Sequence, residues 1–326
     1  MNHTSKAEVK ALLDSIPEPT HLPTAPHIMS AIAPSGAGKT TIYTKMLQAM
    51  QSKSPQEFDH VVLISPSGFP DPDTDLVADG KWAYMRELGF VNENHMDFNR
   101  RLLTQLVQEQ DARKNEWFEY LKDKKDFERI IAEVNKMEDQ DVMKMWVKTQ
   151  FKPPEPPKLN GKVLKRYPQT LLIFDDVGTV NDKYLSDFVC RSRHNNCSIA
   201  FLVQYHKMLP PAIRGSQNFT LIFKTRSDKW LKDIGEEIAT SDMSPDEFAD
   251  IFRMLPERSD FLAIDAKQTD EALRYRVNLN IPLHIFRHAT KERQKEAKEE
   301  SESGPTGGDQ HLAAEITSAK RAKSKS

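Results

Sequence analysis

The sequence predicts an α/β fold with a central, mainly parallel sheet, and three observations predict it. Short, continuous apolar runs recur along the chain, as buried parallel strands require. A glycine-rich loop joins the first of these runs to a helical pattern. Polar side chains directly follow two later runs, and ligands of open α/β sheets bind where the carboxyl ends of such strands meet.

The glycine-rich loop spans residues 33–40 and reads APSGAGKT, which fits the phosphate-binding pattern GxxxxGK[ST] at every fixed position but the first. The apolar residues 28–32 precede it as a strand, and residues 41–47 follow it as the first turns of a helix. A helix N-terminus points unpaired N–H groups at an anion. This context favours a nucleotide site over a chance glycine-rich turn. We expect a nucleotide and Mg²⁺ there, with Lys39 at the phosphates and the Thr40 hydroxyl on the metal. The residues expected to bind nucleotide are Ser35, Gly36, Ala37, Gly38, Lys39, Thr40 and Thr41.

Ala33 stands where the pattern has its first glycine. Alanine would cost about 1 kcal/mol if this position needs a positive φ, and little if φ is negative.

Two acids end the apolar run of residues 170–174. Asp175 is expected to hold Mg²⁺, directly or through water, and Asp176 to orient and deprotonate an attacking water. The alternative is a turn or a helix cap. Gln204 ends the next run, residues 198–203, where it could sense the γ-phosphate or position water; merely capping the strand is the alternative.

Cations between these elements are candidates for stabilising transition-state charge from a neighbouring subunit. They are Arg191, Arg193, His194 and Arg214, of which Arg193 and Arg214 are the predicted catalytic residues. Surface arginines are common, so the cluster is more persuasive than any one member.

The chain is organised around one large domain, residues 28–286, preceded by an arm of residues 1–27 that we expect on the surface or on a neighbouring subunit. Residues 81–160 read as a helical insertion that ends in a proline-rich hinge, residues 152–159. Residues 287–326 form a charged tail too poor in apolar residues to order itself.

Composition excludes some classes of protein. The formal net charge of −2 gives no global basic field for nucleic acid. No apolar run is long enough to cross a bilayer. The two cysteines, Cys190 and Cys197, favour buried free thiols in a reducing compartment over a zinc site.

Taken in order, the segments APSGAGKT, LLIFDD, RSRH, SIAFLVQ and LPPAIRGS resemble the genome-packaging ATPases of large eukaryotic DNA viruses, polintons and virophages, which belong to the FtsK–HerA class of P-loop motors. The resemblance spans roughly residues 28–285. It implies a P-loop fold with the Gln204 strand between the Lys39 and Asp175 strands. Lys39 and Thr40 match the Walker A pair, Asp175 and Asp176 the Walker B acids, Gln204 the sensor, and Arg214 a family arginine after a Pro-Pro turn.

The resemblance also implies a motor that moves duplex DNA into a capsid as a homo-oligomer, usually a hexameric ring, with capsid proteins as further partners. Its place would be at virion assembly sites in the host cytoplasm or nucleus, or in the virion. Ala33 departs from the family pattern, and Asp176 stands where many related motors have glutamate.

Two other functions stay open. One is a nucleotide-binding switch or scaffold with slow hydrolysis, which would need fewer charge-stabilising groups than this chain offers. The other is a small-molecule kinase, which the insertion disfavours because it has no arginine-rich lid.

Overall fold

The computed structural model describes residues 6–66, 80–96, 98–136, 141–142, 144, 152–177, 183–238, 243–288 and 290–292. The chain divides into two compact units, Met1–Asn280 and Ile281–Ser326. The predicted domain boundaries stay a prediction, and residues 293–326 of the predicted tail lie outside the described part.

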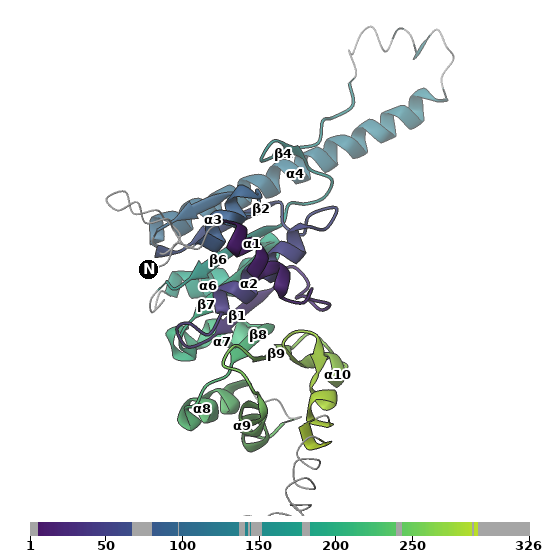
Figure 1. The fold of residues 1–326 in the computed structure, drawn as a ribbon. Helices are drawn as coiled ribbons and strands as arrows, with labels where there is room; N and C mark the ends of the chain where they lie inside the picture. The colour runs from purple at the N-terminus through teal and green to yellow at the C-terminus, as the bar shows by residue number, and fades with distance from the viewer. Residues whose placement is uncertain are drawn as a thin grey trace, which may run out of the picture. The chain divides into compact units, whose positions relative to one another are not determined.

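The first unit is built on a twisted sheet whose strands follow the order β10-β9-β8-β1-β7-β6-β2-β3 (Figure 1). Strands β8, β1, β7, β6, β2 and β3 pair in parallel, and β9 and β10 pair antiparallel at the other end. The strands are β1 (Ile28–Ile32), β2 (His60–Ile64), β3 (Glu93–His95), β6 (Thr170–Asp175), β7 (Cys197–Val203), β8 (Phe219–Phe223), β9 (Phe261–Asp265) and β10 (Tyr275–Val277). This confirms the predicted fold class, with β7 between β1 and β6.

The helices of the first unit connect these strands. They are α1 (Lys6–Ser15), α2 (Lys39–Gln51), α3 (Gly80–Glu87), α4 (Arg100–Val134), α6 (Lys183–Arg191), α7 (Pro211–Ser216), α8 (Asp228–Ile238), α9 (Pro245–Met254) and α10 (Glu271–Arg274), with 3₁₀ turns η2 (Ser192–Asn195) and η3 (His206–Met208). The second unit contributes the short strand β11 (Ile281–Pro282). Within the described residues, no helix is long and apolar enough to cross a membrane.

Strand register places the predicted site residues at one edge of the sheet. Ile32, the last residue of β1, pairs with Val203, the last of β7. Asp175, the last residue of β6, pairs with Leu202. Every residue of these three strands is buried, so their side chains form core on both faces of the sheet. The segments that leave β1, β6 and β7 therefore emerge side by side.

The N-terminal arm packs on the core of the first unit. Helix α1 lies against α3 and α2, and its apolar side chains Val9 and Leu13 are buried in the main hydrophobic cluster. Lys45 of α2 also forms an ion pair with Glu18 at 2.9 Å. We expected this arm on the surface or on a neighbouring subunit; the other residues of α1 are exposed, and the helical spacing of its apolar residues gives the helix one face to bury.

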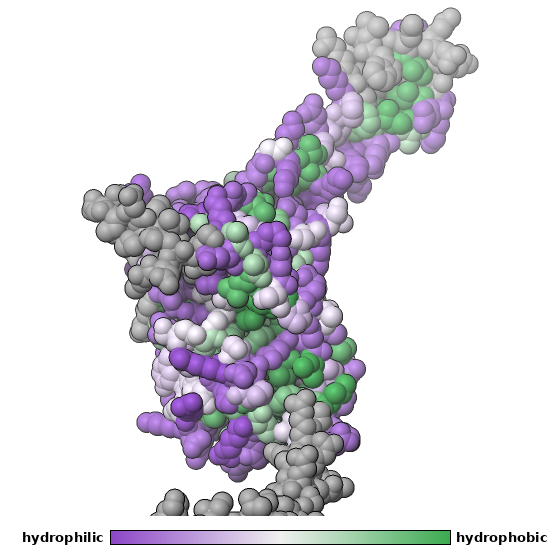
Figure 2. All heavy atoms as spheres, viewed as in Figure 1, coloured by the Kyte–Doolittle hydropathy of each residue, from purple (hydrophilic) through white to green (hydrophobic). Residues whose placement is uncertain are grey.

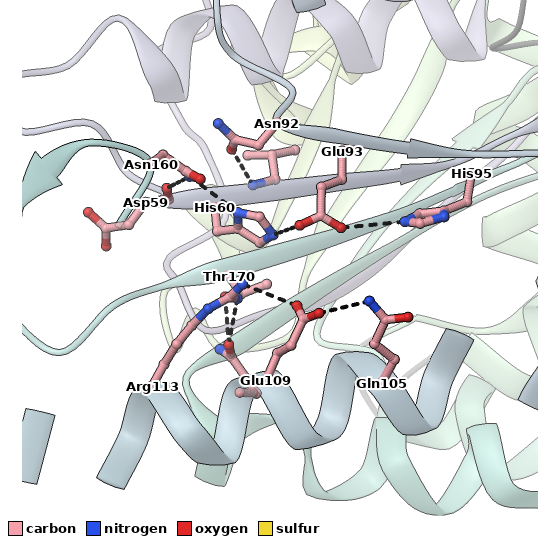
Figure 3. Close-up of polar contacts among 12 residues, drawn as sticks. Asp59, His60, Asn92, Glu93, His95, Gln105, Glu109, Arg113, Asn160 and Thr170 are labelled. Atoms are coloured by element: carbon pink, nitrogen blue, oxygen red, sulfur yellow. Dashed lines mark hydrogen bonds and ion pairs between the residues drawn. The ribbon is translucent and has the colours of Figure 1, made fainter. Parts of the chain in front are cut away.

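The predicted helical insertion is interrupted by a strand that the sequence did not reveal. β3 pairs in parallel with β2 and forms the edge of the sheet. Its residues are Glu93, Asn94 and His95, which are polar and half-buried, so they carry none of the apolar signal of a central strand. Glu93 instead links His60 at 2.9 Å and His95 at 3.4 Å (Figure 3).

Helix α4 is attached to the sheet by its first half. Thr170, which opens β6, donates to the Gln110 side chain at 3.0 Å, and Arg113 donates to Gln110 and Glu109 on its own helix, both at 3.2 Å (Figure 3). The buried residues of α4 run from Leu102 to Trp117, and none lies beyond. The helix continues past the sheet, and apolar side chains lie exposed on that part (Figures 1 and 2).

A short hairpin replaces part of the predicted proline-rich hinge. Strands β4 (Lys158–Leu159) and β5 (Lys162–Val163) are joined by Asn160 and Gly161, both with positive φ, which is the preferred two-residue turn. Asn160 Nδ2 donates to the Asp59 carbonyl at 2.9 Å and to His60 Nδ1 at 3.2 Å, so the turn docks at the start of β2 (Figure 3).

The two cysteines are unpaired, but only one is buried, which corrects the expectation for Cys190. Cys197 lies inside β7, and burial raises the pKa of its thiol to about 12. Cys190 is exposed at the end of α6.

Candidate functional site

The phosphate-binding loop leaves β1 and enters α2 as the sequence predicts. Gly36 has a φ of 74° and Gly38, which caps α2, has a φ of 98°. A Cβ at either position would meet no atom of the chain within 4 Å, so the glycines are needed for their backbone conformation and not for space inside the protein. The Ala37 N–H donates to the Pro34 carbonyl at 3.1 Å, and the other backbone N–H groups of the loop and first turn, residues 35–41, lie at a helix N-terminus, where an anion can bind.

Ala33 fits its position without strain. It is absent from the residues with positive φ, and its N–H donates to the Val203 carbonyl at 3.1 Å, which continues the pairing of β1 with β7. Of the two possibilities that the sequence left open, the one with negative φ and little energetic cost is therefore correct.

Lys39 is held between the two acids that end β6. Its Nζ lies 2.5 Å from Asp176 Oδ1 and 3.9 Å from Asp175 Oδ1, and its side chain is 8% exposed. A buried ammonium needs such partners, because an unpaired charge in a low dielectric is costly. One lysine thereby ties the first turn of α2 to the end of β6.

Asp175 and Thr40 form a set of oxygen donors that fits Mg²⁺. The Thr40 hydroxyl lies 3.4 Å from both carboxylate oxygens of Asp175, which is 1% exposed. Mg²⁺ prefers hard oxygen ligands and is usually held by one or two protein groups together with water and substrate phosphates. These two residues could therefore hold the metal beside the phosphate-binding loop.

Asp176 turns out of the strand. Its φ is 52°, which aspartate tolerates better than most residues, and its N–H donates to the Leu202 carbonyl at 3.2 Å. The carboxylate also accepts from Gln204 Nε2 at 3.4 Å. The side chain is 38% exposed, so water reaches it. The structure thus brings Asp176, Gln204 and Lys39 together; their catalytic roles stay predictions.

The two predicted catalytic arginines do not face these acids within one chain. Arg214 forms a bidentate ion pair with Glu237 of α8, at 2.7 and 2.9 Å, and donates to the Leu209 carbonyl at 2.8 Å. Arg193 lies in η2, before β7 begins, so it is about 20 Å from the Gln204 end of that strand.

Two residues that contact the site belong to none of the motifs described above. Trp82 of α3 donates its Nε1–H to Asp175 Oδ2 at 2.7 Å. Arg258 donates to the Ser35 carbonyl of the phosphate-binding loop at 2.6 Å. Arg258 also lines a cavity of about 530 Å³ with Pro34 and Arg226. Both residues lie far from their partners in sequence and in no motif, so a local pattern could not identify them.

Part of the chain matches a known protein family, and its fold is similar to solved structures of ATPases. Residues 131–236 match the family described as Poxvirus A32 protein. Among curated proteins, no sequence matches the chain. The fold is similar to that of B204, the DNA-packaging ATPase from Sulfolobus turreted icosahedral virus, with 12% identity and a TM-score of 0.42 over 78% of this chain and 97% of B204.

A second similar structure is EssC (ATPases 2 and 3) from Geobacillus thermodenitrificans, with 10% identity and a TM-score of 0.45 over 86% of this chain and 45% of that one. At these identities and TM-scores the structural similarities establish no function. The match to the Poxvirus A32 family supports, over residues 131–236, the resemblance to proteins of large eukaryotic DNA viruses that the sequence indicates.

Proposed function

We propose that this protein is an ATPase that drives double-stranded viral DNA into a capsid. The ATPase assignment rests on one observation: Asp176 contacts both Lys39 and Gln204 beside a phosphate-binding loop. The family match over residues 131–236, together with the sequence resemblance, supports the packaging role.

In the proposed reaction, the backbone N–H groups of residues 35–41 bind the nucleotide phosphates, and Lys39 moves from Asp176 to them. Gln204 orients the attacking water, and Asp176 accepts its proton as the water oxygen bonds to the γ-phosphorus. The bond from that phosphorus to the β–γ bridging oxygen breaks, and ADP and phosphate leave. Thr40 and Asp175 would hold Mg²⁺, which when bound neutralises charge on the phosphates.

We further propose that the working form is a ring of identical subunits. The position of the arginines supports this, because Arg214 is bound to Glu237 and Arg193 precedes β7. Charge stabilisation by arginine would then come from a neighbouring copy. A ring also suits a motor that surrounds duplex DNA, and capsid proteins are its proposed docking partners. On the basis of the sequence resemblance, we propose virion assembly sites in the cytoplasm or nucleus as the location of this activity.

One observation favours a second candidate, a switch with slow hydrolysis. In the single chain, Lys39 and Asp176 bind each other and Arg214 is bound by Glu237, so an isolated subunit has no free arginine of the predicted pair at its acids. Nucleotide binding alone could then be the output.

ATP hydrolysis measured with and without long duplex DNA separates the two candidates. For the motor, we expect DNA to raise the rate, Lys39→Ala to abolish nucleotide binding, and Asp176→Asn to bind ATP without turnover. Sedimentation with and without ATP reports the oligomer in the same samples. If nucleotide binds but the rate of hydrolysis is negligible and does not change when DNA is added, the protein is the switch instead.

A further inference from the structure

Trp82 makes a buried hydrogen bond to the acid that is predicted to hold the metal. Its indole Nε1–H donates to Asp175 Oδ2 at 2.7 Å, and the two residues are 0% and 1% exposed. Such a bond between a donor and an ionised carboxylate is short and strong, and here no solvent competes with it. An indole N–H donates only and does not titrate, so Trp82 can orient the carboxylate but cannot exchange a proton with it.

The position of Trp82 is fixed by the packing of α3. The helix lies against α2, the helix that begins with Lys39 and Thr40. The Trp82 ring contacts Tyr43 of α2, with ring centroids 6.4 Å apart and planes inclined at 55°. Trp82 therefore links two elements of the site, the end of β6 and the helix that follows the phosphate-binding loop.

Asp175 has two carboxylate oxygens, and Trp82 occupies one of them. Oδ1 lies 3.9 Å from Lys39 Nζ, while Oδ2 accepts the indole bond. Fixing Oδ2 restrains rotation of the carboxylate, so Oδ1 stays directed towards Lys39 while the Thr40 hydroxyl keeps its distance of 3.4 Å to both oxygens, where nucleotide and metal would bind. Partners that orient a metal ligand in this way typically change metal affinity or activity by about 10- to 100-fold when they are removed.

We propose that Trp82 is a positioning residue that sets the affinity of the site for Mg²⁺ with nucleotide by holding the Asp175 carboxylate. This inference rests on the proposed function, since it assumes that Asp175 serves a Mg²⁺–nucleotide complex.

The test is a Mg²⁺ titration of nucleotide binding, followed by calorimetry with a non-hydrolysable ATP analogue. Trp82→Phe keeps an aromatic ring in the core but removes the donor. We expect the Mg²⁺ concentration at half-saturation to rise about 10-fold or more, with binding of the analogue in the absence of metal nearly unchanged. Trp117→Phe is the matched control, because Trp117 is also buried and makes no hydrogen bond through its indole within the described residues.

A double-mutant cycle asks whether the effect passes through Asp175. In an Asp175→Asn background, Trp82→Phe should change the Mg²⁺ dependence by less than about 2-fold. A wild-type Mg²⁺ dependence in Trp82→Phe, an equal shift in Trp117→Phe, or full additivity in the cycle would each overturn the proposal. If the wild-type protein itself binds no Mg²⁺–nucleotide, the proposed function fails together with this inference. If the wild type binds it and one of the three outcomes above is seen, only the inference about Trp82 fails.

A measurement on the wild-type chain covers the case in which Trp82→Phe does not fold. The chain has four tryptophans, so the Trp82 indole resonance can be assigned by elimination with Trp117→Phe, Trp146→Phe and Trp230→Phe. At saturating analogue, the Trp82 indole proton should shift as Mg²⁺ is added, with the midpoint seen by calorimetry. A resonance that ignores Mg²⁺ would overturn the proposal.

Discussion

Lys39 Nζ lies 2.5 Å from Asp176 Oδ1, so the lysine of the phosphate-binding loop and the acid that directly follows β6 form an ion pair. Both groups are predicted to act on the nucleotide, one on its phosphates and the other on the attacking water. In the proposed mechanism, nucleotide draws Lys39 away before Asp176 accepts a proton, so nucleotide binding and activation of the proposed base would be coupled through this one contact.

Asp176→Asn should separate binding from hydrolysis. The amide cannot accept the proton of water, and it releases Lys39 for the phosphates. We expect ATP to bind at least as tightly as in the wild type, while kcat falls about 10²- to 10⁴-fold. Calorimetry and single-turnover hydrolysis measure the two quantities, with Asp250→Asn on the exposed face of α9 as the control. A kcat within a factor of about ten of the wild type would exclude Asp176 as the base.

Ala33→Gly should not improve the site, although it restores the glycine of the pattern. Ala33 is buried, has no positive φ, and bonds to Val203 through its N–H. Glycine would add freedom to the unfolded chain without relieving strain in the folded one. We expect a loss of about 0.4–1 kcal/mol in the free energy of unfolding and unchanged ATP affinity. Urea unfolding and calorimetry test this. A gain in ATP affinity would mean that alanine hinders the loop.

Local sequence patterns predict the site residues that lie beside a strand but not those that reach the site from distant parts of the chain. Five site residues lie at the end of a predicted strand or in the segment that follows it, so parallel register alone brings them to one edge of the sheet. They are Lys39, Thr40, Asp175, Asp176 and Gln204. Trp82 reaches Asp175 from 93 residues away, and Arg258 reaches Ser35 from 223 residues away. Such contacts depend on tertiary packing, which no short-range pattern encodes.

The contacts of Arg214 and the strand β3 could not be predicted from local patterns either. Arg214 follows a recognisable Pro-Pro turn, yet its partner Glu237 lies on another helix and could not be read from that turn. The strand β3 could not be predicted because its three residues are polar and half-buried at the sheet edge, so they lack the apolar pattern of a strand.

Arg214→Ala should lower stability even if Arg214 also acts on a neighbouring subunit. The guanidinium is mostly buried and makes three hydrogen bonds, two of them to the Glu237 carboxylate. Hydrogen bonds to charged groups contribute roughly 1.5–3 kcal/mol, so we expect a loss of about 2 kcal/mol in the free energy of unfolding. Exposed Arg193 provides the matched control, and Arg193→Ala should change it by less than about 0.5 kcal/mol. Equal losses in the two variants would contradict the structural role of the Arg214–Glu237 pair.

The unfolding free energy should fall in mild acid because two histidines are buried in the neutral form. Burial lowers the pKa of His206 to about 4 and that of His27 to about 3. An unfolded histidine titrates near pH 6.5, so between there and the folded pKa the unfolded chain binds more protons than the folded one. The stability from these histidines is therefore complete above about pH 6.5 and is lost as the pH falls towards 4, by up to about 1.4 kcal/mol per pH unit for each.

Urea unfolding at a series of pH values between 7.5 and 4.5 measures this slope. His206→Gln removes one titrating group and should reduce the slope by up to about 1.4 kcal/mol per pH unit, because a neutral amide replaces a ring that must stay unprotonated. His194→Gln, at an exposed position of η2, should leave the slope as it is. His206 lies 3.4 Å from Glu237, whose charge favours the protonated ring and so opposes the effect of burial. A slope unchanged by His206→Gln would mean that this attraction keeps His206 titrating as it does in the unfolded chain.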